Sequence, residues 1–410
     1  MLAKNKKRVT IGLLIPFVLI LFTPPAGAEI FRFKHQKGNT SRIISTTDEN
    51  IYINGELSHH SIIVNRIFVE VKDVKDNGVG ILETHYMTTE NADFEESEKV
   101  LKWGQEYYSI FERNARGEYT ISDDYFMPVV RNVPVFPEYD VQPGDTWTFQ
   151  GEEAHDLRQT FNIEKPYKIP FTAEYTYKGT IEEKGRKLHI ILVNYTIMYK
   201  SPKKPTNAEN YPVKNFIYSN ETLYWDNERG ALVHYDENFH LLFEMSLGNI
   251  YEFVGTAHAY VTEQTIKNTK SNRDTIKQEI DNLNIDNTTA EITERGIKIS
   301  LEKIRFKAES ADLMNSEKEK LKKIASILSR LPENDLLIEG HTAQWGSEES
   351  QMQLSEERAH SVAHYLLSLK VKDASQIFIK GHGGQVPIAP NDSEENMARN
   401  RRVEITVLDN

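Results

Sequence analysis

The sequence predicts an α+β protein with two domains: an N-terminal antiparallel β sandwich or barrel, then a smaller α/β sandwich with the order βαβαββ. Residues 29–261 form short runs of alternating apolar and polar side chains, separated by turn signals. Residues 288–410 alternate between strand-like apolar runs and helices with one apolar face. Between them, residues 262–287 are rich in Lys, Asn, Asp and Thr and contain no Gly or Pro.

Residues 1–28 have the pattern of a signal peptide. A basic segment, Lys4–Arg8, precedes an apolar run at Ile11–Phe22. Ala26-Gly27-Ala28 follows in the small-residue arrangement that signal peptidase cleaves. We expect an exported protein of the periplasm, with association with the outer membrane as a further option. An uncleaved N-terminal anchor is the alternative.

Residues 29–261 are predicted to be β-rich. Runs such as Phe171–Tyr177 and Leu188–Ile197 are rich in β-branched and aromatic side chains, which suit a pleated, half-buried surface. Turn signals such as Pro143-Gly144-Asp145 separate them. A membrane barrel would show a similar alternation. The heavily charged stretch Thr89–Lys99 favours a soluble β-domain instead.

Residues 262–287 are predicted to be a polar, partly helical linker. Ile276, Ile280 and Leu283 fall on one narrow helical stripe. Two interpretations remain open for this stripe. It belongs either to a solvated spacer, which the polar composition favours, or to a helix that binds a partner.

Residues 288–410 are predicted to alternate strand and helix. Ser316 followed by Glu319 indicates a capping box at the start of the first helix. Glu348 and Glu349 suit the first turn of a second helix that starts near Ser347, because the helix dipole favours acids there. We expect strands at residues 296–301, 336–339, 377–379 and 403–407.

Several short motifs then occur in order along this segment. They are Ile338-Glu339-Gly340-His341-Thr342, Leu354-Ser355-x-x-Arg358-Ala359-x-x-Val362, Gly381-x-Gly383, Pro387-Ile388-Ala389 and Asn400-Arg401-Arg402-Val403-Glu404-Ile405. On these motifs, residues from about 292 to 407 resemble the OmpA-like C-terminal domain. The resemblance implies a non-enzymatic cell-envelope protein that associates non-covalently with peptidoglycan. The implied ligand is the peptide stem of the cell wall, often through its diaminopimelate residue.

The resemblance also implies a binding site. The family holds the zwitterionic end of the stem with an arginine and an aspartate, and Arg358 matches the arginine, whose planar fork suits a carboxylate. The aspartate position, directly after His341-Thr342, is Ala343 here, and a position where the family prefers Asn is Gln351. The expected peptidoglycan-binding residues are Arg358, Thr342, Gln351, Ala343 and Arg401.

Ala343 leaves three possibilities open, because losing a charged hydrogen bond costs about 1.5–3 kcal/mol. Binding persists in weaker form through Arg358, Thr342 and backbone donors; or the site suits a stem whose third residue lacks the second carboxylate; or the domain is a scaffold that has lost wall binding. In the last case, function resides in a ligand- or protein-binding β-domain. Arg358 itself could simply pair with a nearby acid of the helix, such as Glu348, Glu349, Glu356 or Glu357.

Composition excludes several function classes. The formal charge of −12 argues against a nucleic-acid partner, which needs a basic surface. The chain has no cysteine, so thiol catalysis and thiolate metal sites are absent. No nucleophile elbow, phosphate loop or metal-binding histidine motif occurs, and we expect no enzyme activity, cofactor or metal. The expected partners are the peptidoglycan stem peptide and other envelope proteins. Trp103, Trp147 and Trp225 either line a groove for a glycan or peptide or, as we favour, belong to the core.

Overall fold

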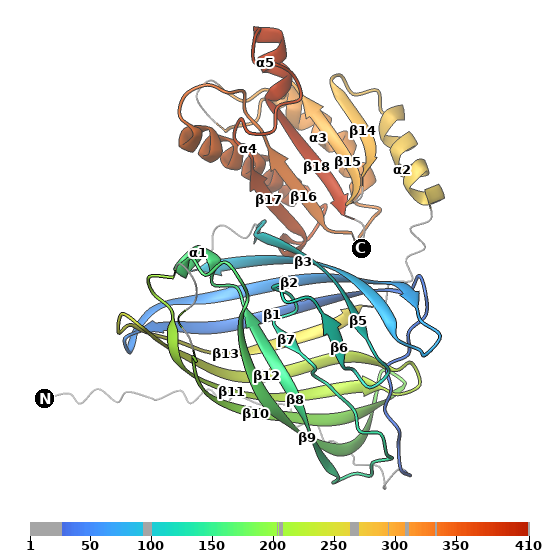
Figure 1. Ribbon diagram of the computed structural model, residues 1–410. Helices are drawn as coiled ribbons and strands as arrows, with labels where there is room; N and C mark the ends of the chain where they lie inside the picture. Colours follow the sequence, from blue (N-terminus) through green and yellow to red (C-terminus); the bar gives the residue numbers. More distant parts are fainter. Residues whose placement is uncertain are drawn as a thin grey trace, which may run out of the picture.

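The computed structural model describes residues 27–92, 101–202, 204, 208–262, 270–293, 295–307, 311–332 and 334–408. These form a large curved β-sheet and a smaller α/β domain (Figure 1), so the predicted α+β class is confirmed. Residues 1–26 of the predicted signal peptide lie outside the described residues. Among the helices of the described part, none is both long enough and apolar enough to cross a membrane.

The N-terminal domain is a twelve-stranded antiparallel sheet with the order β6-β5-β3-β2-β1-β13-β12-β11-β10-β9-β8-β7. It curls into a nearly barrel-shaped form (Figure 1). Its two edge strands, β6 and β7, are neighbours in the sequence, so the segment between them joins the two edges. A short helix, α1 (Arg158–Phe161), follows β8. The strands are β1 (Thr40–Ile53), β2 (Glu56–Val74), β3 (Gly80–Ala92), β5 (Gln105–Arg113), β6 (Tyr119–Ile121), β7 (Val130–Arg131), β8 (Thr146–His155), β9 (Tyr167–Glu183), β10 (Arg186–Lys200), β11 (Pro212–Asp226), β12 (Ala231–Met245) and β13 (Ile250–Thr262).

The inner face of this sheet holds the core of the domain. Along β9, every second residue from Tyr167 to Tyr177 is buried, which is the period of a strand with one covered face. Trp147 and Trp225 are buried in the same cluster. The interpretation of these two tryptophans as core residues is therefore confirmed.

The C-terminal domain is a six-stranded sheet with the order β14-β15-β18-β16-β17-β4 and helices packed on it (Figure 1). All the predicted strands and both predicted helices occur. The structure adds β14, which forms a hairpin with β15, and a short helix before the last strand. The elements are β14 (Thr288–Thr293), β15 (Gly296–Glu302), α3 (Asn315–Leu328), β16 (Leu336–Gly340), α4 (Glu348–Ser368), the 3₁₀ turn η1 (Ala374–Gln376), β17 (Ile377–Gly381), α5 (Glu394–Asn400) and β18 (Arg402–Leu408).

The segment between the domains contains a helix, α2 (Lys270–Asn282), as expected. Its apolar stripe is not solvated, however. Ile280 is buried in the core of the C-terminal domain, and Ile276 and Leu283 pack against that core. The preference for a solvated spacer is therefore wrong for this helix, because burying three apolar side chains outweighs the polar composition of the rest. Residues 263–269 lie outside the described part of the chain.

The two domains contact each other directly. Strand β4 (Leu101–Lys102), from the β-domain, pairs in parallel with β17, and the Trp103 N–H donates to the Ile379 carbonyl at 2.7 Å. The Trp103 ring meets the Phe378 ring edge to face, with 5.7 Å between centroids. Arg66 on β2 forms an ion pair with Asp335 at 2.8 Å. Trp103 is thus an interdomain residue rather than part of a groove or of the β-domain core.

Candidate functional site

The N-terminal half of α4 packs tightly on the ends of two strands. A side chain at Gly340 would overlap the carbonyl oxygen of Ser355, and one at Gly381 would place its Cβ 2.7 Å from the Ser355 hydroxyl. That hydroxyl donates to the Met352 carbonyl at 2.7 Å and accepts the Gly383 N–H at 2.9 Å. The glycines and the serine of the motifs therefore set the distance between helix and sheet. Arg358 lies one turn beyond this contact, so its position follows from it.

Asn400 holds the loops that border the site. It is fully buried, and its Oδ1 accepts the N–H groups of Ile388 and Ala389 at 2.9 and 3.0 Å. Its Nδ2 donates to the Ala389 carbonyl at 2.8 Å and to Asn391 Oδ1 at 3.0 Å. Asn391 Oδ1 also accepts the Gln344 N–H at 3.2 Å. One buried amide thus links the loop before α5 to the loop before α4.

Arg358 is half-buried and carries an unpaired charge. Its guanidinium carbon lies 4.9 Å from the centroid of the Phe306 ring, and its Nε has no hydrogen-bond partner. Burial, and then the positive charge of Arg401, lower the pKa of Arg358. Within the described ranges no helix acid forms an ion pair with Arg358: Glu356 pairs with Lys102, and Glu357 acts on the guanidinium only through its charge, which raises the pKa of Arg358 by less than burial lowers it. Since an arginine stays protonated in proteins, this is a cation that can accept an anion.

Of the other predicted site residues, Thr342, Ala343 and Gln351 lie around the start of α4, whereas Arg401 lies at the end of α5. The Thr342 N–H donates to the Gly383 carbonyl at 2.8 Å, while its buried Oγ1 has no hydrogen-bond partner. Ala343 is buried. Gln351 is also buried and donates from Nε2 to the Gly346 carbonyl at 3.0 Å, so its amide supports the loop. Arg401 forms an ion pair with Glu394.

His341 has the environment of a structural residue. It is buried, and its ring stacks on His382 at 4.8 Å between centroids. Burial, and then the charge of Arg402, lower the pKa of His341 to about 2, so the ring stays neutral at ordinary pH. Arg402 is itself buried and pairs with Glu404 at 2.7 Å, which leaves it no role toward a ligand.

The sequence did not reveal the roles of three residues in the site. Ser355 and Asn400 were part of the motifs, but nothing local indicated that they position α4 and the bordering loops. Phe306, the ring under Arg358, lies outside every motif. Only the packing of the segment after β15 against α4 brings it to the arginine.

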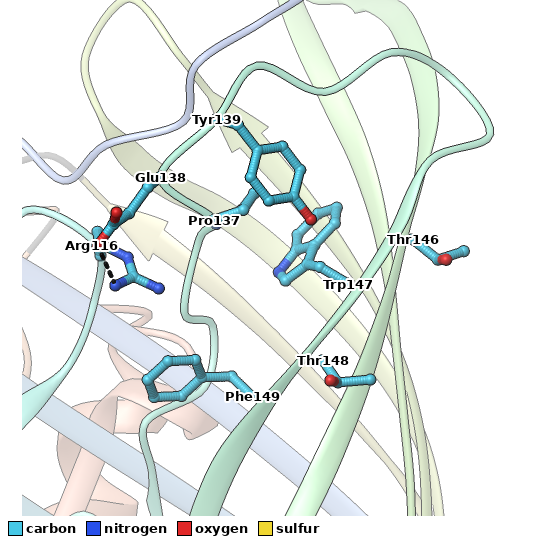
Figure 2. Close-up of a pocket in the computed structure, with 8 residues that line it drawn as sticks. All are labelled: Arg116, Pro137, Glu138, Tyr139, Thr146, Trp147, Thr148 and Phe149. Atoms are coloured by element: carbon cyan, nitrogen blue, oxygen red, sulfur yellow. Dashed lines mark hydrogen bonds and ion pairs between the residues drawn. The ribbon is translucent and has the colours of Figure 1, made fainter.

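A hollow in the β-domain, of about 580 Å³, is another place where a ligand could be sought. Figure 2 shows its lining, with Tyr139 beside Trp147 and Arg116 turned toward Glu138. Arg116 is fully engaged, since it donates to the Phe136 carbonyl at 2.7 Å and pairs with Glu138 at 3.2 Å. The hollow therefore offers no unpaired charge, and we assign it no ligand. In the part of the chain that the structure describes, no group of three or more His, Asp or Glu could hold a metal ion.

Comparison with known proteins places the C-terminal segment in a family. The OmpA family model matches residues 305–401. The chain is 37% identical over 123 residues to the probable lipoprotein YiaD of Escherichia coli (strain K12), which covers 29% of this chain and 56% of that protein. It is 38% identical over 104 residues to the peptidoglycan-binding protein ArfA of Mycobacterium tuberculosis, covering 25% of this chain and 32% of that one. The chain thus spans about half or a third of the length of these curated relatives.

Among solved structures, an outer membrane protein from Borrelia burgdorferi B31 is 40% identical to the chain. The match covers 30% of this chain and 97% of that one, with a TM-score of 0.26.

Proposed function

Because residues 305–401 of this chain belong to the OmpA family, we propose that the protein associates non-covalently with peptidoglycan through its C-terminal domain. One relative of this domain is described as the peptidoglycan-binding protein ArfA. The observation that carries the proposal is the unpaired guanidinium of Arg358, held in place by the Ser355 contact.

The expected ligand group is a carboxylate of the stem peptide. A planar guanidinium can donate two parallel hydrogen bonds to it, and such charge-assisted bonds are among the strongest in proteins. Arg401, which lies close enough to lower the pKa of Arg358, adds positive potential. The free Thr342 hydroxyl and nearby backbone groups would support the ligand.

Ala343 limits what the site can hold. Its buried methyl group offers neither charge nor hydrogen bond to an ammonium group. A stem with a zwitterionic end would bind about ten- to a hundredfold more weakly to this site than to one with a carboxylate side chain at position 343. A stem whose third residue lacks the second carboxylate would keep the ammonium group and lose the carboxylate that Arg358 would hold, so Arg358 favours a stem that carries this carboxylate.

The proposed setting is the periplasm, reached through the signal peptide predicted at residues 1–28. Two relatives are described as a probable lipoprotein and as outer membrane protein A, which is consistent with a cell-envelope location. The role is mechanical, and the domain would hold the β-domain at the wall without catalysis.

The test is co-sedimentation of the full-length protein with purified peptidoglycan sacculi. We expect the wild type to sediment and Arg358→Ala to lose at least about tenfold in affinity. Arg330→Ala is the matched control, because Arg330 is exposed and pairs with Glu279. An Arg358→Ala variant that sediments like wild type would refute the proposal. If only Ala343→Asp sediments, the site is disabled and function must be sought in the β-domain.

A further inference from the structure

Trp345 is the most unusual exposed side chain near the candidate site. It is 82% exposed and lies in the loop of residues 342–347, which begins at Thr342 and Ala343. Val386, 47% exposed, and Ile388, 40% exposed, lie in the loop before α5 that is hydrogen-bonded to it. Full exposure of so large an apolar group forgoes a sizeable hydrophobic gain, and such patches commonly mark binding sites.

The loop that carries Trp345 is held on both sides. Before it, Gln344 donates its N–H to Asn391 Oδ1 at 3.2 Å and its Nε2 to the Gly384 carbonyl at 3.1 Å. After it, Gly346 adopts a positive φ of 81°, and its carbonyl accepts from Gln351. Ser347 then caps α4 through the Ser350 N–H at 3.2 Å. A loop backbone held in this way loses little conformational entropy when Trp345 binds a ligand.

We propose that Trp345 is a sugar-stacking residue, which receives a ring of the glycan strand when the stem peptide occupies Arg358. The inference rests on the proposed function, because the stem is covalently attached to that strand. A ligand held at Arg358 therefore brings sugar to the rim of the same site. An indole face suits the apolar C–H face of a sugar ring, and the neighbouring amides can meet its hydroxyls.

The charge around Trp345 distinguishes this partner from a lipid surface. Glu348 and Glu349 follow it in the first turn of α4, and Asp392 lies on the adjoining loop, whereas Glu394 is paired with Arg401. These acids would repel anionic lipid headgroups, whereas a neutral sugar is not repelled. An exposed tryptophan meant for such a membrane surface would be expected among basic residues.

The experiment compares two soluble ligands on the full-length protein by calorimetric titration. They are the free stem tetrapeptide and the disaccharide tetrapeptide, which differ only in the sugars. We expect wild type to bind the disaccharide form about five- to twentyfold more tightly. Trp345→Ala should bind both forms equally, at the wild-type affinity for the peptide alone, and Trp345→Phe should keep part of the gain. Tyr139→Ala, which removes an exposed ring in the β-domain, should behave like wild type.

The outcomes separate this inference from the proposed function. If wild type binds the peptide but gains nothing from the sugars, or if Trp345→Ala keeps the gain, the sugar role is refuted and wall binding stands. If wild type binds neither ligand, both fail. Flotation with phosphatidylglycerol vesicles tests the other partner: wild-type binding that is lost in Trp345→Ala would replace the sugar with a membrane surface.

Discussion

Replacing Arg66 with alanine should loosen the contact between the two domains. Arg66 Nε donates to Asp335 Oδ2 at 2.8 Å, and its guanidinium carbon lies 4.1 Å from the centroid of the Phe378 ring. The side chains of Arg66 and Asp335 are only 11% and 7% exposed. The substitution would leave the Asp335 carboxylate buried without this partner.

The magnitude follows from that burial. Removing one partner of a buried ion pair costs about 3–5 kcal/mol, because the remaining charge is uncompensated. The contact with Phe378 contributes up to about 2 kcal/mol of this when it is shielded from water. Around the pair, Met87 packs with Leu337, Phe378 and Leu408, so water has little access. We expect Arg66→Ala to lower the free energy of unfolding by about 3–5 kcal/mol.

The assay is a double-mutant cycle by urea unfolding with Arg66→Ala, Asp335→Ala and the pair. Far-ultraviolet circular dichroism and tryptophan fluorescence, which Trp103 at the interface will report, should be followed together. Coincident transitions are expected for wild type, and separated ones for Arg66→Ala as the domains uncouple. The expected coupling free energy is about 2 kcal/mol.

A matched control is available at the rim of the same interface. Arg295 and Glu106 form an ion pair at 2.9 Å, but their side chains are 46% and 37% exposed. Such a pair contributes at most about 1 kcal/mol, so Arg295→Ala should change little. A coupling between Arg66 and Asp335 below about 0.5 kcal/mol would refute the docked arrangement.

Three further predictions concern stability within the domains. Gly340→Ala forces a methyl group against the Ser355 carbonyl oxygen, and should lower the free energy of unfolding in urea by about 2–4 kcal/mol. Peptidoglycan binding that is unaffected by this substitution would contradict the role of the Gly340–Ser355 contact in placing α4. Asn400→Ala removes four hydrogen bonds and should speed amide exchange at Ile388 and Ala389, while unchanged exchange would show that the loop is held by other contacts. Burial raises the pKa of Glu237 to about 7, so the folded protein binds its proton more tightly than the unfolded chain, and stability should fall as pH rises from about 4.5 to 7. When the free energy of unfolding is measured at several pH values, Glu237→Gln should reduce this fall by about 1–3 kcal/mol. A pH profile that the substitution leaves unchanged would contradict the raised pKa of Glu237.

Local patterns served well where an element is defined by its own residues. Helix α4 begins at Glu348 with Ser347 as its cap, as the acids and the serine indicated. The capping box expected at Ser316 and Glu319 is wrong. Helix α3 begins at Asn315 after Met314, and Ser316 bonds to Glu317 instead. A Ser followed three residues later by Glu is compatible with a helix that begins at residue 315 or at residue 317, and tertiary contacts determine which of the two occurs.

The resemblance to the OmpA-like domain was enough to single out Arg358, because the Leu354-Ser355-x-x-Arg358-Ala359 motif matches the family's arginine. It could not show whether that arginine was paired. Its position over Phe306 depends on how the segment after β15 folds back on α4.

By itself, the sequence determined the α+β class, the family of the C-terminal domain and the position of its candidate arginine. The class follows from periodicity, whereas the family and the arginine follow from the resemblance that the short motifs carry. The tertiary structure alone decided that α2 belongs to the C-terminal core and that β4 completes the C-terminal sheet. It also decided that Arg66 and Trp103 join the domains. The contacts of β4, Arg66 and Trp103 join residues far apart in the sequence, and no pattern in either segment indicates which partner it meets. The apolar stripe of α2 was visible in the sequence, but the core that it packs against was not.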